Sequence, residues 1–112
     1  MATTTYKRLA AAAGNGTIAT ASTLYTCPAA TAAVVSSVVI CNASSTAYTY
    51  TLAVHTGTAF AAGSYVVYQA TIAANDTVSL TLGVTLDATN KYLLASSSNA
   101  AVNFSVFGAE IA

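Results

Sequence analysis

Apolar and hydroxyl-bearing residues alternate in short segments along this chain, and that alternation constrains the fold more than any other feature. In the segment 102–106, Val, Phe and Val alternate with Asn and Ser. Because successive side chains of a β-strand point to opposite faces, such a segment forms a strand with one apolar face and one polar face. The same pattern runs through residues 48–55 and 77–82. It predicts half-buried strands that line a shared core.

The segment 33–41 differs, because apolar residues occupy both of its faces. Between Val34 and Ile40 every residue is Val or Ile except Ser36 and Ser37. Continuous apolar runs are typical of strands that are covered on both sides. This pattern predicts a central strand, covered on both faces at one end.

Turn-forming residues separate these segments at short and fairly even intervals. The turn signals lie at residues 14–16, 28, 42–45, 57, 62–63, 75–76, 83 and 87–90. The strands are predicted at residues 5–12, 22–27, 33–42, 47–56, 64–72, 77–82, 91–97 and 101–111. This arrangement predicts one all-β domain over residues 1–112, a single antiparallel β-sandwich or jelly-roll-like barrel of about eight short strands. Residues 1–5 are interpreted as an extended arm that reaches a neighbour.

One of these segments has a competing helical interpretation. Leu9–Ala13 contain four alanines, and alanine is the best helix former. Five residues ended by Gly14 are too few to propagate a helix. We therefore expect no helix longer than one or two turns.

The chain is almost without charge. Three basic and three acidic residues make up 5% of its 112 residues, whereas an ordinary soluble domain has about 25%. Its mass predicts a folded surface of about 5,700 Å², or roughly one charge per 950 Å². A neutral monomer with so few charges tends to self-associate. We therefore expect a homo-oligomer, with a trimer as the favoured state, whose surface is kept wet by Thr, Ser and Asn.

The same composition argues against two classes of partner. Nucleic-acid binding needs Lys and Arg to displace the counterions of phosphates, and the chain has only Lys7, Arg8 and Lys91. Membrane spanning by a helix needs a run of about 18 apolar residues, and no run approaches that length. We expect neither nucleic acid nor membrane as a partner.

The titratable residues give no sign of catalysis. His55 is the single histidine, and histidine is the usual proton-transfer residue near neutral pH. The three carboxylates, Asp76, Asp87 and Glu110, are scattered along the sequence. We interpret His55 as an ordinary exposed or interface residue. The sequence therefore predicts no enzyme, no catalytic, cofactor-binding or metal-binding residue, and no cofactor.

Tyrosines offer a second candidate site, because the chain has seven tyrosines and no tryptophan. Tyr48, Tyr50, Tyr65 and Tyr68 would suit a sugar-binding groove, since aromatic faces stack on apolar ligand surfaces. Tyr48 and Tyr50 also share a strand face with apolar residues, which favours packing or subunit contacts. Both interpretations remain open at this stage.

Cys27 and Cys41 are the only cysteines. If segments 22–27 and 33–42 pair as a hairpin, Cys27 lies at the turn and Cys41 roughly 26 Å along the strand. A disulfide requires Cα atoms within about 7 Å of each other. We expect two free thiols.

The chain shows no export signal in our interpretation. Lys7 and Arg8 precede the apolar run Leu9–Ala13, but this run has five residues, and an export signal needs about 7–15. The Asn-x-Ser/Thr sites at Asn15, Asn42, Asn75 and Asn103 then carry no meaning for glycosylation. We expect the chain to stay in the cytosol until it assembles.

Two stretches carry a resemblance to a known family. Residues 23–35, Thr-Leu-Tyr-Thr-Cys-Pro-Ala-Ala-Thr-Ala-Ala-Val-Val, resemble small β-sandwich virion structural proteins of tailed bacteriophages, in which a strand ends in Tyr-x-x-Pro before a short turn. Residues 38–42, 73–78 and 104–111 fit the same pattern. In that family the turn carries Gly where this chain has Ala29 and Ala30.

The resemblance implies a structural role in a phage particle that is assembled in the host cytoplasm. Such a subunit would be a capsid decoration or cement protein, or a neck or tail accessory protein, that stabilises the assembly through contacts with itself and other virion proteins. The alternative is a host-surface or carbohydrate-binding adhesin module of a phage tail, which the tyrosines would serve.

Overall fold

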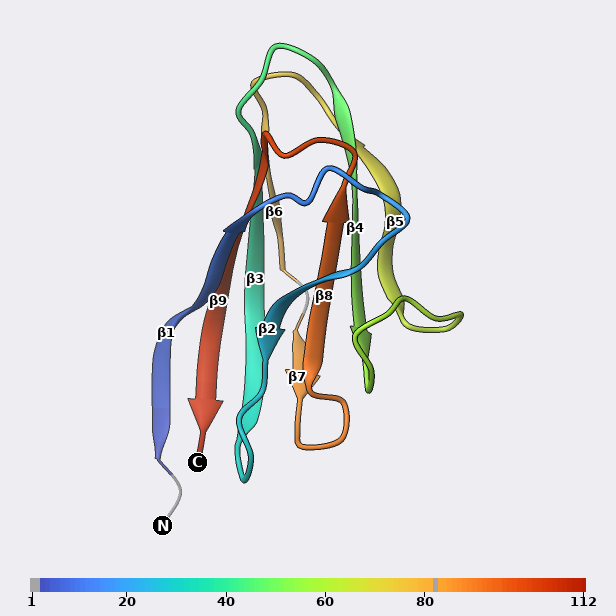
Figure 1. Ribbon diagram of the computed structural model, residues 1–112. Helices are drawn as coiled ribbons and strands as arrows, with labels where there is room; N and C mark the ends of the chain where they lie inside the picture. Colours follow the sequence, from blue (N-terminus) through green and yellow to red (C-terminus); the bar gives the residue numbers. More distant parts are fainter. Residues whose placement is uncertain (1–2, 82) are drawn as a thin grey trace.

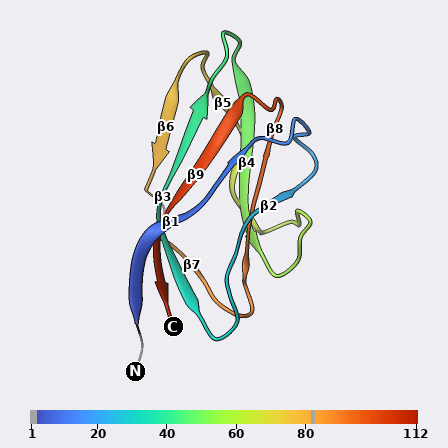
Figure 2. The ribbon, with the colours of Figure 1, turned by 60° about the vertical axis from the view of Figure 1, so that its left-hand side comes forward.

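The computed structural model describes residues 3–81 and 83–112, and these residues form nine β-strands. The strands are β1 (Thr4–Ala13), β2 (Ser22–Thr26), β3 (Ala32–Asn42), β4 (Tyr48–His55), β5 (Tyr65–Ile72), β6 (Thr77–Leu80), β7 (Val84–Leu86), β8 (Tyr92–Ser97) and β9 (Val102–Ile111). They form two antiparallel sheets that face each other (Figures 1 and 2). The predicted all-β sandwich is confirmed.

The strands pair in a nested order. β1 pairs with β9, β2 with β8, β3 with β6 and β7, and β4 with β5. This nested ribbon folds over, so that its members fall into sheet A, with the order β1-β9-β3-β6 and β7 also on β3, and sheet B, with the order β2-β8-β4-β5. Such an order is that of a jelly roll, one of the two architectures that the sequence predicted.

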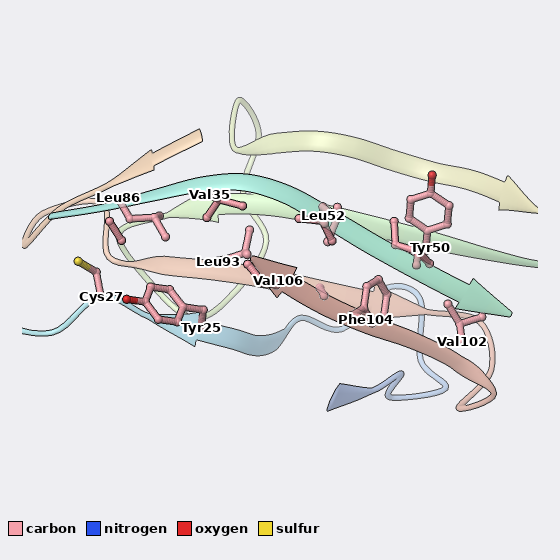
Figure 3. Close-up of a cluster of buried hydrophobic side chains, with 14 of the residues drawn as sticks. Tyr25, Cys27, Val35, Tyr50, Leu52, Leu86, Leu93, Val102, Phe104 and Val106 are labelled. Atoms are coloured by element: carbon pink, nitrogen blue, oxygen red, sulfur yellow. The ribbon is translucent and has the colours of Figure 1, made fainter. Parts of the chain in front are cut away.

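The core lies between the two sheets, where the predicted alternation places it. Val102, Phe104 and Val106 of β9 are at most 2% exposed. They point toward Leu52 of β4 and Leu93 of β8 (Figure 3). β3 is central in sheet A, as its apolar run predicted, and its outer face is partly buried. Burial of these apolar faces is the main force that holds the sheets together.

The segment predicted as one strand over 77–82 departs from that expectation. β6 ends at Leu80, position 82 lies outside the described residues, and a separate strand, β7, follows after Gly83. Both strands pair with β3, β6 along Val38–Cys41 and β7 along Ala33–Val35. A strand of three residues is too short to show an alternating pattern, so the sequence analysis missed β7.

The predicted hairpin between segments 22–27 and 33–42 is wrong. β2 belongs to sheet B and β3 to sheet A, so the turn at residues 27–31 crosses from one sheet to the other. The reason is that β2 and β3 each find an alternative antiparallel partner, β8 and β9 respectively. Cys27 is buried, Cys41 is half-buried, and both thiols are free.

The N-terminal segment forms a strand where the helical alternative lay. Leu9–Ala13 belong to β1. Thr4 and Thr5, which the sequence analysis placed in an arm, pair with Ile111 and Glu110 of β9, and residues 1–2 of that arm lie outside the described residues. Among residues 3–81 and 83–112 there is no helix long and apolar enough to cross a membrane.

Candidate binding surface on sheet B

The segment 14–21, between β1 and β2, crosses the outer face of sheet B (Figure 1). The Ser96 hydroxyl donates a hydrogen bond of 2.7 Å to the Ile18 carbonyl oxygen. The side chain of Asn15 accepts a bond of 3.2 Å from the Ser97 amide. As a result Ser96 on β8 and its neighbour Thr51 on β4 are each only 1% exposed, although they lie on the outer face. Part of this face is therefore a covered, preformed floor.

A bulge in β5 forms the rim of this floor. Ala70 pairs with Tyr50 and Val67 pairs with Leu52, so two residues of β5, Tyr68 and Gln69, lie opposite Thr51. Gln69 adopts φ 48°, in the left-handed region, and its amide donates a 3.0 Å bond to the Thr51 hydroxyl. Bulges of this kind re-aim side chains, and here the bulge brings two consecutive side chains to one place.

Three aromatic rings gather beside the bulge. The ring centroids of Phe60 and Tyr65 are 5.5 Å apart, and those of Tyr65 and Tyr68 are 4.8 Å apart in an edge-to-face arrangement at 73°. Tyr65 is 40% exposed and Tyr68 is 62% exposed. With Ile18, Thr51 and Gln69, the rings line a pocket of about 100 Å³, and none of the described residues that line it is charged. The arrangement offers ring surfaces, hydroxyls and an amide to a neutral ligand.

The four tyrosines named from the sequence do not form one groove. Tyr65 and Tyr68 meet at the pocket, whereas Tyr50 is 4% exposed in the core and Tyr48 packs against the core. Packing, the second interpretation, is thus confirmed for Tyr48 and Tyr50, and their place in a shared groove is wrong. His55 lies at the end of β4, outside the pocket lining.

Sequence reasoning missed Phe60 and Gln69 for a physical reason. Residues 65 and 68 are an odd number of positions apart, so strict alternation would put their rings on opposite faces. Two register shifts in β5, opposite Leu52 and its neighbours, bring both rings to one face. Phe60 comes from the loop between β4 and β5. Only the dipeptide Tyr68-Gln69 beside a hydroxyl-rich strand hints at the site.

A second cluster connects the sheets near the end of β9. Lys7 of β1 forms an ion pair of 2.7 Å with Glu110, and the Tyr25 hydroxyl of β2 donates a hydrogen bond to the same carboxylate. Lys7 first, and then Tyr25, lower the pKa of Glu110. Burial, followed by the hydrogen bond to Glu110, raises the pKa of Tyr25. The sequence analysis treated Glu110 as a scattered carboxylate, but the pairing of β1 with β9 gives it a partner.

The other two carboxylates belong to turns. The Asp87 carboxylate accepts 2.8 Å hydrogen bonds from the backbone amides of Thr89 and Asn90, and these bonds lower its pKa. The Asp76 carboxylate accepts a bond of 2.9 Å from the Thr77 amide. In the described part of the chain, no three His, Cys, Asp or Glu side chains come together as a metal site would require.

Comparison with known proteins gives limited similarity. No family model matches the chain, and neither does any curated protein. A chain in the structure of infectious bursal disease virus, Gx strain, superposes with a TM-score of 0.49 at 12% identity, over 99% of this chain and 32% of that one. The corresponding values for the Gt strain are 0.48, 9%, 98% and 31%. This chain thus spans about a third of the length of those solved chains.

Proposed function

We propose that this chain is a non-enzymatic structural subunit of a virus particle. In the finer form of the proposal, the particle is a tailed phage assembled in the host cytoplasm, and the subunit is a capsid decoration or cement protein or a neck or tail accessory protein. It stabilises the assembly through contacts with its own copies and with other virion proteins. The observation that carries the proposal is the open edge of β1, which presents an exposed tyrosine.

The charge distribution supports a role in assembly. The surface of 5477 Å² carries six charged side chains, or about one per 900 Å². Two of them, Lys7 and Glu110, neutralise each other in the ion pair. A surface with so little charge has little electrostatic repulsion between copies. Partner contacts that cover part of it would account for this composition.

The edge of β1 can be derived from the hydrogen bonds at its start. Thr3 and Ala112 exchange two backbone hydrogen bonds of 2.7 and 3.0 Å. In an antiparallel ladder, doubly bonded pairs alternate with pairs whose backbone groups point away. The N–H and C=O groups of Thr4, Tyr6 and Arg8 therefore point to the free edge of sheet A, where β1 is the last strand. An open edge of this kind is a template for pairing with another chain.

Tyr6 adds an apolar anchor to this edge. Its side chain is 83% exposed, the most exposed of the large hydrophobic residues among those described. It lies in one cross-strand row with Ala109 and Val34 on the outer face of sheet A. Phe107, 38% exposed, lies in the next row on the same face. Aromatic residues are enriched at protein interfaces, so edge and rings together form one contact surface.

Two variants of Tyr6 test this contact. Tyr6→Ser removes the ring and keeps the edge N–H, whereas Tyr6→Pro removes both and breaks no bond within the subunit, because proline is tolerated at such an edge position. We expect the wild type to be a homo-oligomer, the trimer being the favoured state, by light scattering at tens of micromolar. Tyr6→Ser should associate more weakly and Tyr6→Pro should be monomeric, with unchanged circular dichroism. A wild type that is cleanly monomeric would contradict the proposal.

The virion role needs a separate measurement. Quantitative mass spectrometry of purified particles should find the chain in many copies, in a fixed ratio to a major capsid or tail protein. Density for a jelly roll of this size in a particle reconstruction would then give its location. Absence of the chain from purified particles would refute the virion role and leave the self-association standing.

A further inference from the structure

We propose that the pocket between Tyr65, Tyr68 and Gln69 binds one sugar residue of an uncharged glycan. This binding activity goes beyond the structural role proposed above, and it lies on the opposite sheet from the β1 edge. It can therefore hold or fail independently of that role.

The size and shape of the pocket favour one ring of a larger ligand. Its volume of about 100 Å³ is well below the roughly 300–1,000 Å³ of pockets that enclose a whole small molecule. Tyr68, at its rim, is 62% exposed. A ligand would insert one edge into the pocket, and its remainder would lie across the ring of Tyr68.

The chemistry of the lining selects a neutral, hydroxyl-bearing ligand. Sugar rings have apolar C–H faces that stack on aromatic rings, and hydroxyl edges that pair with amides and phenols. The lining supplies the rings of Phe60, Tyr65 and Tyr68 together with the Gln69 amide, and none of its described residues is charged. A charged ligand would find no counter-charge there. A purely apolar side chain would leave the amide and hydroxyls unpaired, which costs binding energy.

The construction of the site supports binding rather than simple packing. Gln69 is held in the left-handed backbone region, which residues other than glycine avoid. Its amide is held by the Thr51 hydroxyl, and Thr51 is buried beneath the segment that Ser96 ties down at Ile18. Backbone strain that is stabilised by the surrounding structure is found preferentially at ligand sites. Rigid rings and a fixed amide also lower the entropy lost on binding.

The experiment uses an array of neutral glycans, followed by titration with the methyl glycosides of glucose, galactose, mannose and N-acetylglucosamine. Binding is followed by tyrosine fluorescence, since the chain has no tryptophan. We expect at least one neutral glycan to bind, and acidic glycans to gain nothing from their charge. Gln69→Gly removes the amide but suits φ 48°, so this variant should fold at least as well as the wild type. Both Gln69→Gly and Tyr68→Ala should weaken binding at least tenfold.

The matched control is Tyr6→Ser on sheet A, which should bind the same glycan with unchanged affinity. Three results would overturn the proposal. One is an array on which no neutral glycan binds. Another is binding that both pocket variants leave unchanged. The third is a change of oligomeric state in Tyr68→Ala without glycan binding, which would make the rings a subunit contact. Failure of the structural proposal would instead appear in the Tyr6 variants and in the particle analysis.

Discussion

At the scale of single residues, the turn after β2 contains an unfavourable backbone conformation. Ala30 adopts φ 55°, as do few residues other than Gly, Asn and Asp. Its methyl group makes the left-handed conformation costly, and alanine has no side-chain polar group to compensate. Asn75 has the same φ value and belongs to the tolerant residue types.

Ala30→Gly should therefore stabilise the protein. The relief of strain, about 1–2 kcal/mol, exceeds the entropy cost of glycine in the unfolded chain, so the net gain should be about 0.5–1 kcal/mol. Urea unfolding with a constant m-value is the measurement. Ala29→Gly is the control, because the φ of Ala29 is not positive, and it should be slightly destabilising. Equal effects of the two substitutions would contradict the left-handed turn.

The sequence pointed to this position without explaining it. The resemblance to phage proteins singled out Ala29 and Ala30 because the family carries Gly there, and the φ of Ala30 supplies the physical reason. Alternation likewise placed Phe104 in the core, where it is 2% exposed. The φ of Gln69 had no such signal, because it depends on the neighbouring strand that supplies Thr51.

At the scale of the elements, alternation predicted the existence of eight of the nine strands, with ends within about two residues. It could not predict which strands pair, because pairing depends on contacts between segments far apart in the sequence. The hairpin of 22–27 with 33–42 was wrong for that reason. Bulges were also invisible to it, and the bulge at Tyr68 and Gln69 is what assembles the candidate pocket.

The cluster that joins β1, β2 and β9 should make stability depend on acid pH. The pKa of Glu110 is lower in the folded protein than in the unfolded chain, so its contribution is fully present above the ordinary glutamate value of about 4.3. The contribution is lost as the pH falls through the lower, folded pKa, because the unfolded chain takes up the proton first.

Glu110→Gln should flatten the decline in unfolding free energy between pH 5 and more acidic conditions. Tyr25→Phe should flatten it less, because Lys7 lowers the pKa of Glu110 more than Tyr25 does. Urea unfolding at a series of pH values measures both effects. If Glu110→Gln keeps the wild-type slope, the carboxylate is not held by Lys7 and Tyr25 in solution.

At the scale of the whole molecule, the contacts between copies should be insensitive to salt. Salt weakens attraction between exposed charges, and this surface has about one charge per 900 Å². The association constant should change by less than about threefold between 0.05 and 1 M NaCl, and sulfate should increase it by strengthening apolar burial. Sedimentation equilibrium is the measurement. Dissociation in 1 M NaCl would show that ion pairs hold the copies together.

The nested pairing of the strands has a consequence for how the molecule folds and exchanges. β4 and β5 are joined by a short loop, whereas β1 meets β9 across almost the whole chain, from Thr4 to Ile111. Closure of longer loops costs more entropy and slows folding, so the inner pairs close first and β1 docks last. A β1 that detaches leaves the other three pairs in place and uncovers the edge of β9. The β1 strand of a neighbouring copy has the same sequence and fits that vacated edge, so subunits that meet while folding have a ready route to interlock by strand exchange.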